Sequence, residues 1–234
     1  MPLVARLIDP VGPGSPSLAG ESGVVVVCGS RIGHCPRLAG MEEALTQPQL
    51  PRGFTYMPGL FDPRSAAAHL AALLAEVAWE RRDFAIYGRV VAMPRLIAMY
   101  GPVGYRYSGV EHPPRPMPAR VAAIRDRVEA ATGTRFNSVL LNLYRDGRDS
   151  VSWHRDNDYD HGGQPDIASV SFGATRRFQL RHEAGRRAAI ALESGSLLLA
   201  TGEALERWWH CVPKTTRAVG PRVNLTFRHM VGPT

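Results

Sequence analysis

The spacing of apolar residues predicts two helices in the first half of the chain. The first is expected over residues 62–79, where alanine, leucine and valine recur on one face. Asp62 can cap free backbone N–H groups at a helix start, and Pro63 fits the first turn. The second is expected over residues 118–132, with arginines facing outward and Gly133 ending the helix. The core-facing positions of the two helices are Leu70, Leu73, Leu74, Val77, Val121, Ile124 and Val128.

The second half of the chain has no further helical period and is built from short strands. Turn residues separate these strands, which we expect over residues 138–144, 167–172, 177–182, 188–192, 196–201, 208–212 and 222–229. Many short strands with turn signals between them are typical of a sandwich or a barrel. Because helices precede them, we predict an α+β fold, a double-stranded β-helix (jelly roll) core backed by two N-terminal helices.

Two further segments precede this core. Residues 1–50 are rich in glycine, proline and serine, so we predict a poorly structured extension there and an ordered domain over residues 51–234. Residues 54–57 read as a short strand, and residues 82–110 alternate between strand and turn, with aromatic side chains punctuated by glycines.

Composition narrows the classes of protein. No apolar run approaches the roughly 20 residues that span a bilayer, so we expect no membrane association. Three cysteines form no disulfide framework, which favours a reducing, cytoplasmic location. The net charge of +7 and the pI of about 9.8 favour a polyanionic partner such as nucleic acid, although a basic surface without a partner gives the same values.

A histidine and an aspartate stand two residues apart at His154 and Asp156, and His210 follows in another predicted strand. Alternate residues of a strand share a face, so His154 and Asp156 can point at one atom. Two histidines and one carboxylate form the facial triad that binds non-haem iron and leaves positions open for a cosubstrate and oxygen. The spacing of His154 and Asp156 alone is weak evidence, because chance supplies it often.

The last predicted strand carries polar side chains on one face, at Arg222, Asn224, Thr226 and Arg228. If that face points inward, its polar groups need partners. Two arginines there favour a buried dianion, and 2-oxoglutarate is one. A strand with one solvated face is the structural alternative. Asn142 and Tyr144 also share a face of their strand, where an amide and a phenol could bind the same acid; a half-buried strand is the plainer explanation.

Together these residues resemble the DNA-repair branch of the AlkB-type Fe(II)/2-oxoglutarate-dependent nucleic-acid dealkylases. The matching signatures are Asn142-Leu-Tyr144, His154-Arg-Asp156, Ala168-Ser-Val-Ser-Phe-Gly173, His210 and Arg222-Val-Asn-Leu-Thr-Phe-Arg228. The last is the family's Arg-x-Asn-x-Thr-Phe-Arg motif without departure. The resemblance covers at least residues 84–230 and implies a dioxygenase domain over residues 51–234. Within that domain it implies a nucleotide-recognition region over residues 84–112 and a jelly-roll catalytic core over residues 136–230.

The resemblance implies both the reaction and the residues that serve it. His154, Asp156 and His210 would bind Fe(II). Arg222, helped by Tyr144, would bind the distal carboxylate of 2-oxoglutarate. The metal-proximal end would be served by Arg228 and Asn142, with Asn224 and Thr226 in support. An alkyl group on a base nitrogen would be oxidised and lost as an aldehyde, while 2-oxoglutarate and O₂ become succinate and CO₂.

Substrate recognition is implied at several positions. Tyr87 would be the aromatic wedge that fills the gap left by a flipped base, and Ser108 belongs to the same region. Tyr105 and Tyr107 are candidates to stack on the extruded base. Asp158 would favour cationic bases such as 1-methyladenine and 3-methylcytosine. Arginines that could meet phosphates are Arg145, Arg148, Arg155, Arg176 and Arg181.

The substrate remains open among several classes. We expect a monomer acting on alkylated DNA, single- or double-stranded. RNA, or a free or peptide-linked substrate, keeps the same iron chemistry as an alternative. A non-enzymatic binding module with a decayed site, or a lectin or storage jelly roll, would share the fold. The intact triad and both cosubstrate arginines argue against these last two.

Overall fold

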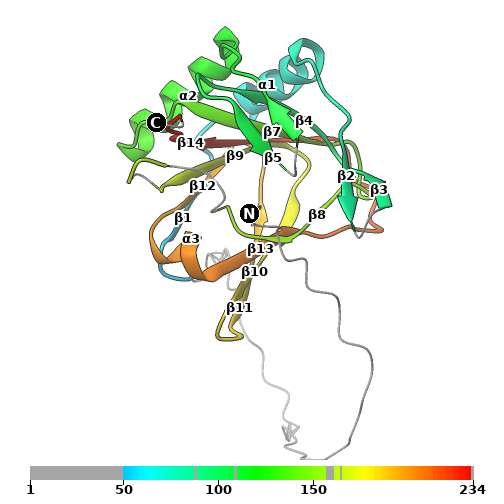
Figure 1. The fold of residues 1–234 in the computed structure, drawn as a ribbon, viewed down its shortest axis with the longest axis vertical. Coiled ribbons are helices and arrows are strands. Elements are labelled where there is room, and N and C mark those ends of the chain that lie inside the picture. The colour runs from blue at the N-terminus through cyan, green and yellow to red at the C-terminus, as the bar shows by residue number, and fades with distance from the viewer. Residues whose placement is uncertain (1–49, 87–88, 108–109, 157–160, 164, 233–234) are drawn as a thin grey trace, which may run out of the picture. The chain divides into compact units, whose positions relative to one another are not determined.

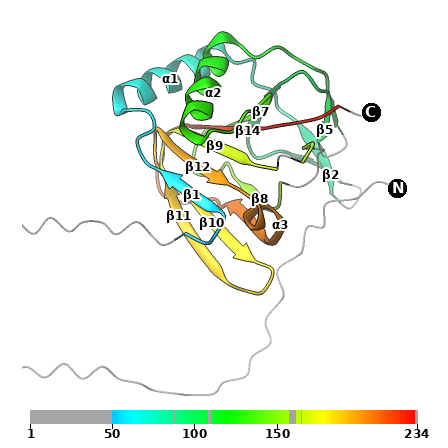
Figure 2. The ribbon, with the colours of Figure 1, turned by 90° about the vertical axis from the view of Figure 1, so that its left-hand side faces the viewer.

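Two antiparallel sheets form the centre of the domain, shown in Figure 1 and, from the side, in Figure 2. This computed structural model describes residues 50–232, except 87–88, 108–109, 157–160 and 164. The larger sheet has the order β1 (Phe54–Met57), β12 (Ser196–Ala200), β9 (Ile167–Gly173), β14 (Arg222–Arg228), β7 (Ser138–Tyr144) and β4 (Leu96–Tyr100). The smaller sheet has the order β11 (Arg187–Leu192), β10 (Arg176–His182), β13 (Trp208–Val212) and β8 (Val151–His154).

Strands that are distant in sequence pair within both sheets, as the predicted topology requires. The last strand, β14, lies between β7 and β9, so it occupies the middle of the larger sheet. The antiparallel arrangement is consistent with a jelly-roll core. The predicted extension over residues 1–50 lies outside the described residues except for Leu50, so that boundary stays a prediction.

Two helices of 14 residues each, α1 (Pro63–Glu76) and α2 (Ala119–Thr132), lie on the outer face of the larger sheet (Figure 2). Asp62 caps α1, because its side chain accepts hydrogen bonds from the backbone N–H groups of Arg64 and Ser65. Alternate residues of β14 pack toward the helices in one apolar core. This core includes Leu73, Val121, Ile124, Val128, Val223, Leu225 and Phe227.

Three local predictions differ from the structure. The first helix ends at Glu76 instead of residue 79, because Val77 has an extended backbone. Strand β8 (Val151–His154) was missing from the strands expected, since four residues with one polar interruption carry little periodicity. The short helix α3 (Glu203–Arg207) was also missed, because a single turn is too short to show a helical period.

The described residues between 83 and 112 include two small two-stranded sheets, of which β2, β3 and β5 are labelled in Figure 1. One joins β2 (Asp83–Ile86) to β3 (Arg89–Ala92), and the other joins β5 (Tyr105–Tyr107) to β6 (Val110–His112). Strand β4 lies between the hairpins in sequence and connects them to β7. The strand-and-turn pattern predicted for this segment therefore corresponds to a pair of hairpins around an edge strand.

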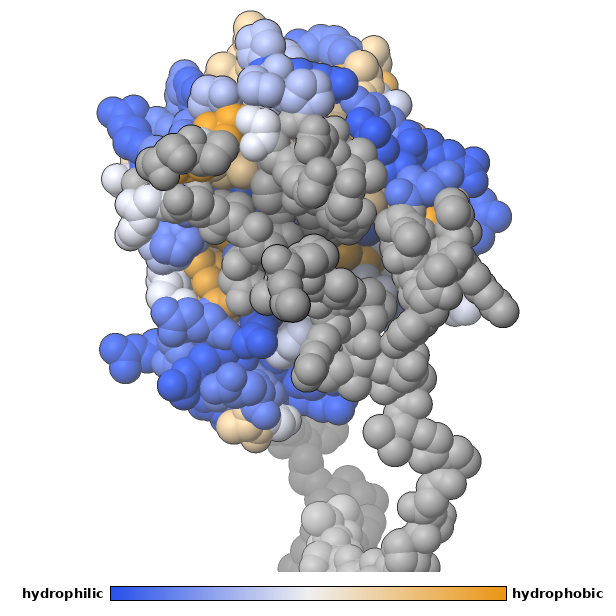
Figure 3. Space-filling model, in the orientation of Figure 1, coloured by the Kyte–Doolittle hydropathy of each residue, from blue (hydrophilic) through white to orange (hydrophobic). Residues whose placement is uncertain are grey.

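The surface of the described residues is mainly polar. In Figure 3, hydrophilic residues gather at the lower end of the molecule, where the β10–β11 turn exposes residues 183–187. Val91 is the one large apolar side chain that is exposed among the residues whose burial is described. None of the helices between residues 50 and 232 is both long and apolar enough to cross a membrane.

Gly173, at the end of β9, is expected to tolerate no side chain. Its φ is +93°, and an added Cβ would lie 2.3 Å from the carbonyl oxygen of Pro221, so both strain and a clash oppose substitution. We expect Gly173→Ala to lower the free energy of unfolding by about 3 kcal/mol. Gly133→Ala is the matched control, because φ is +73° there but nothing lies within 4 Å, so only about 1 kcal/mol should be lost. Equal losses in urea unfolding of the two variants would contradict the clash.

Candidate metal centre

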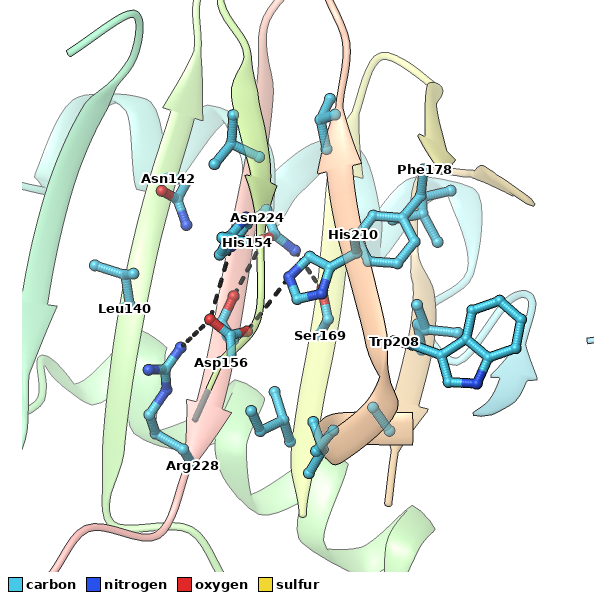
Figure 4. Close-up of a pocket in the computed structure, with 18 of the residues that line it drawn as sticks. Leu140, Asn142, His154, Asp156, Ser169, Phe178, Trp208, His210, Asn224 and Arg228 are labelled. Carbon is cyan, nitrogen blue, oxygen red and sulfur yellow. Dashed lines mark hydrogen bonds and ion pairs between the residues drawn. The ribbon is translucent and has the colours of Figure 1, made fainter. Parts of the chain in front are cut away.

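Three potential metal ligands meet between the two sheets (Figure 4). His154 ends β8 and pairs in register with His210 of β13, so both imidazoles lie on one face of the smaller sheet. Asp156 lies 3.7 Å from Nε2 of His154 and 3.6 Å from Nε2 of His210. One potential ligand atom from each residue lies within 4.8 Å of the others, a spacing that suits a single bound cation.

The chain brings His154 and Asp156 together in a way that strand alternation did not predict. Strand β8 ends at His154, and Asp156 lies in a bend just beyond it. The two side chains therefore converge because the chain turns after the strand, and not because they share a pleat.

Neighbouring groups orient both imidazoles. Nδ1 of His154 lies 2.8 Å from the carbonyl oxygen of Ser152. A carbonyl oxygen only accepts, so Nδ1 is the donor of this bond, and Nε2 is the nitrogen that faces Asp156. The ring of Phe178 stacks on His210 at 5.1 Å between centroids and 27° between planes. These two contacts fix the directions in which the ring nitrogens of His154 and His210 point.

The charges of the site favour a cation. Burial by itself raises the pKa of Asp156, but Arg228, His210 and His154 outweigh it and lower that pKa to about 2. Burial, with a smaller contribution from His154, lowers the pKa of His210 to about 3. At neutral pH the aspartate is therefore ionised and His210 is neutral, which are the protonation states that bind a divalent metal ion.

A buried arginine lies at each end of β14. Arg228 is 2% exposed, and its NH2 lies 3.7 Å from Oδ1 of Asp156. Arg222 is 1% exposed, donates from NH2 to the hydroxyl of Ser171 at 2.9 Å, and lies over the ring of Tyr144 at 5.0 Å. The two cations thus mark a metal-proximal and a metal-distal end of the same pocket.

Arg222 provides the test of whether the pocket fits an acidic cosubstrate. Its Nε and NH1 are buried, and neither has a hydrogen-bond partner among the described residues. Burial lowers the pKa of Arg222, as expected for a cation without a counter-charge. A buried guanidinium with two free donors that lines the same pocket as the triad is suited to bind a carboxylate, so the residues fit Fe(II) and 2-oxoglutarate.

Asn224 and Thr226 line the same pocket, but they bind mainly protein groups. The amide nitrogen of Asn224 donates to the hydroxyl of Ser169 at 2.8 Å and to the carbonyl of Val170 at 2.9 Å. The hydroxyl of Thr226 lies 3.2 Å from Oδ1 of Asn224. The two bonds of Asn224 tie β14 to β9, and the bond of Thr226 stays within β14.

Arg95 is a charged residue of the pocket that the sequence analysis did not assign to the site. It is 5% exposed, lines the pocket, and donates from Nε to Oδ1 of Asn142 at 2.7 Å. It also contributes to the low pKa of Asp156. Arg95 lies between the apolar residues Met93 and Leu96 in the sequence. A charged side chain in an apolar segment needs a polar partner if it is buried, and this could have marked Arg95 as a candidate site residue.

The residues predicted to contact substrate are placed less completely. Tyr87, Ser108 and Asp158 lie outside the described residues. Tyr105 and Tyr107 are alternate positions of β5, so they share a face of that strand, but their side chains are not described.

Arg176 is wrong as a phosphate contact. It is 3% exposed and donates to the backbone carbonyls of Asp146, Asp149 and Pro213, which leaves it no access to a backbone phosphate. Among the other candidates, Arg145 and Arg148 bind Asp149 and Asp146, and Arg155 lies over Trp209.

Comparisons with known proteins bear on the family of this chain. The sequence pattern of the 2OG-Fe(II) oxygenase superfamily matches residues 53–228. The chain is 41% identical over 182 residues to the human alpha-ketoglutarate-dependent dioxygenase alkB homolog 3, covering 73% of this chain and 64% of that protein. It is 39% identical over 157 residues to the human DNA oxidative demethylase ALKBH2, covering 62% of this chain and 60% of that protein.

The chain therefore spans slightly less than two thirds of the length of these relatives. A solved structure, OsALKBH1, superposes with a TM-score of 0.60 at 15% identity, covering 77% of this chain and 99% of that one. At that identity the likeness bears on the fold alone.

Proposed function

The chain belongs to the 2OG-Fe(II) oxygenase superfamily as an AlkB-type dioxygenase, and we propose that it repairs DNA by oxidative removal of alkyl groups from base nitrogens. The family uses Fe(II), 2-oxoglutarate and O₂. The substrate class is supported by the relatives, among which are proteins named DNA oxidative demethylase, and by the basic charge of the chain.

One observation carries the enzymatic part of this proposal. The His154, Asp156 and His210 cluster shares its pocket with Arg222, a buried cation that has two free donors. A metal site alone could be structural, and a buried arginine alone could be an unsatisfied group. Their combination in one pocket supplies both halves of a site for iron and a dicarboxylate.

The chain's own residues hold and orient the reactants in this proposal. The triad would hold Fe(II), and Arg222 would form fork-shaped hydrogen bonds with the distal carboxylate of 2-oxoglutarate, with Tyr144 packed against its guanidinium. Arg228, beside Asp156, would balance negative charge at the metal-proximal end together with Asn142. When bound, iron, 2-oxoglutarate and O₂ supply the oxidising chemistry that hydroxylates the alkyl carbon.

Substrate recognition is proposed for the 83–112 hairpins and the loop after Asp156. A base inside a duplex must leave the stack to reach the pocket, so aromatic groups on the hairpins would stack on it or fill the gap. Tyr87, Tyr105, Tyr107 and Ser108 remain our candidates there, and Asp158 remains the candidate for selecting a cationic base. We propose a cytoplasmic location, which is supported by three cysteines that form no disulfide framework, and a monomeric state.

The proposal is tested by mass spectrometry of oligonucleotides that contain 3-methylcytosine, single-stranded and paired, and of a matched RNA. Each is incubated with the protein, Fe(II), 2-oxoglutarate, ascorbate and air. We expect a mass loss of one CH₂ group from DNA, dependent on both iron and 2-oxoglutarate. Control reactions omit one component at a time.

The outcomes separate the alternatives. Loss of the methyl group from RNA alone would move the proposal to an RNA substrate. Succinate formation without any change in the oligonucleotides would indicate a different substrate for the same iron chemistry. No succinate and no mass loss from a protein with bound iron would contradict the enzymatic proposal.

A further inference from the structure

We propose that Glu80 is a positioning residue that anchors the base of the 83–112 segment and thereby sets the affinity for the nucleic-acid substrate. The inference rests on the function proposed above, because the segment contains the candidate recognition hairpins. Glu80 itself lies before β2 and does not line the pocket.

Backbone hydrogen bonds close the segment at its base. Glu80 and Ile97 exchange two bonds, of 2.8 and 3.0 Å, and Gly101 and Arg115 exchange two more, also of 2.8 and 3.0 Å. The first pair closes the β2–β3 hairpin against β4 and the second closes the β5–β6 hairpin just after β4, which itself stays paired with β7 of the larger sheet. Between Glu80 and Arg115 are the two hairpins and β4.

The carboxylate of Glu80 binds the two sides of this base to each other. Its Oε1 accepts a hydrogen bond from NH1 of Arg115 at 2.5 Å, just after β6. Its Oε2 accepts one from NH2 of Arg82, just before β2. A single carboxylate therefore links the entry and the exit of the segment, and each oxygen serves a different arginine.

The carboxylate of Glu80 is better shielded from water than that of an ordinary surface pair. The side chain of Glu80 is 21% exposed and that of Arg82 is 28% exposed, whereas that of Arg115 is 39% exposed. Burial opposes ionisation of Glu80, but the hydrogen bonds from Arg115 and Arg82 outweigh it and lower its pKa. Partial burial reduces screening by solvent, so the two charge-assisted bonds hold their geometry more firmly than exposed pairs do.

A short path of backbone pairing connects Glu80 to the pocket. Glu80 pairs with Ile97 of β4, and Ile97 pairs in register with Asn142 of β7. Asn142 lines the pocket and binds Arg95, which lies directly before β4. Because the pairing with β7 holds β4 in the larger sheet, loss of the Glu80 carboxylate is expected to change the approach of the hairpins to the pocket and to leave Asn142 and the triad in place.

The test is fluorescence anisotropy with a labelled single-stranded oligonucleotide that contains 3-methylcytosine. Mn(II) replaces iron so that no turnover occurs. We expect Glu80→Ala to raise the dissociation constant of the oligonucleotide roughly tenfold and Glu80→Gln to raise it less, because the amide oxygen can still accept one bond. The KM for 2-oxoglutarate, measured by succinate formation with iron, should change by less than about twofold.

Glu76→Ala is the matched control. Glu76 also binds an arginine, Arg120, through hydrogen bonds of 3.0 and 3.1 Å, but this exposed pair joins α1 to α2 away from the hairpins. Glu76→Ala should leave both the dissociation constant of the oligonucleotide and the KM for 2-oxoglutarate unchanged. If Glu80→Ala does not fold, Arg115→Met removes the same contact from the other side and should weaken oligonucleotide binding in the same direction.

Equal oligonucleotide affinity in wild type and Glu80→Ala would overturn the positioning role. An equal loss of oligonucleotide and 2-oxoglutarate affinity would also overturn it, because that pattern marks a general structural defect. A wild-type protein that neither binds nor dealkylates nucleic acid would refute the proposed function, and the role of Glu80 with it. A wild type that binds, with Glu80→Ala binding equally well, would refute the role of Glu80 alone.

Discussion

Asp156→Asn is expected to lower iron-dependent succinate formation by at least roughly a thousandfold, or about 4 kcal/mol of transition-state stabilisation. The substitution keeps the size of the side chain but removes its negative charge. Two imidazoles would then remain as ligands, with Arg228 close by and no carboxylate to offset it. Without the negative charge of Asp156, the positive charge of Arg228 would repel a divalent cation. The affinity of the site for the metal ion should therefore fall together with the activity.

Metal binding distinguishes this loss from a folding defect. Calorimetric titration with Mn(II) should give a dissociation constant at least about 100-fold above that of wild type, while the circular dichroism spectrum stays unchanged. Asp146→Asn is the matched control, because it makes the same change in net charge at a partly exposed aspartate that lies outside the pocket and binds Arg148. Wild-type metal affinity in Asp156→Asn would contradict the assignment of the triad.

The pocket residues of β14 could be predicted from the sequence because polar and apolar residues alternate regularly along this strand. In β14, Arg222, Asn224, Thr226 and Arg228 line the pocket, while Val223, Leu225 and Phe227 pack in the core, as alternation predicts. What alternation could not decide was whether the polar face is solvated or buried. The structure buries both faces, because the smaller sheet covers the pocket side and the helices cover the other.

The parts of the site that were missed depend on contacts between distant segments. Arg95 donates a hydrogen bond to Asn142, which lies 47 positions away in the sequence. A pairing over that distance cannot be predicted from a local sequence pattern. The convergence of His154 and Asp156 depends on a bend after β8, and its direction is set by packing instead of by strand period. Arg176 looked like any surface arginine in sequence, and only the fold gives it three backbone carbonyls as partners.

Arg222→Met should separate cosubstrate binding from metal binding. We expect the KM for 2-oxoglutarate to rise roughly a hundredfold, equivalent to about 2.7 kcal/mol, because truncating one partner of a buried ion pair leaves the other charge unpaired. Mn(II) affinity should stay within about twofold, since Arg222 lies at the metal-distal end of the pocket. Arg222→Lys keeps the positive charge but loses the paired donors of the guanidinium. Its KM for 2-oxoglutarate should therefore lie between those of wild type and Arg222→Met.

Arg222→Met is predicted to lose activity without losing stability. Without 2-oxoglutarate, wild type buries a guanidinium with two unpartnered nitrogens, and removing such a charge relieves its desolvation. The variant should therefore unfold at or above the wild-type temperature when the cosubstrate is absent. Added 2-oxoglutarate should raise the unfolding temperature of wild type and of the control Arg177→Met, an exposed arginine of β10, but not of Arg222→Met. An equal rise in all three proteins would mean that the dicarboxylate binds without Arg222, and the pocket would then need another anion receptor.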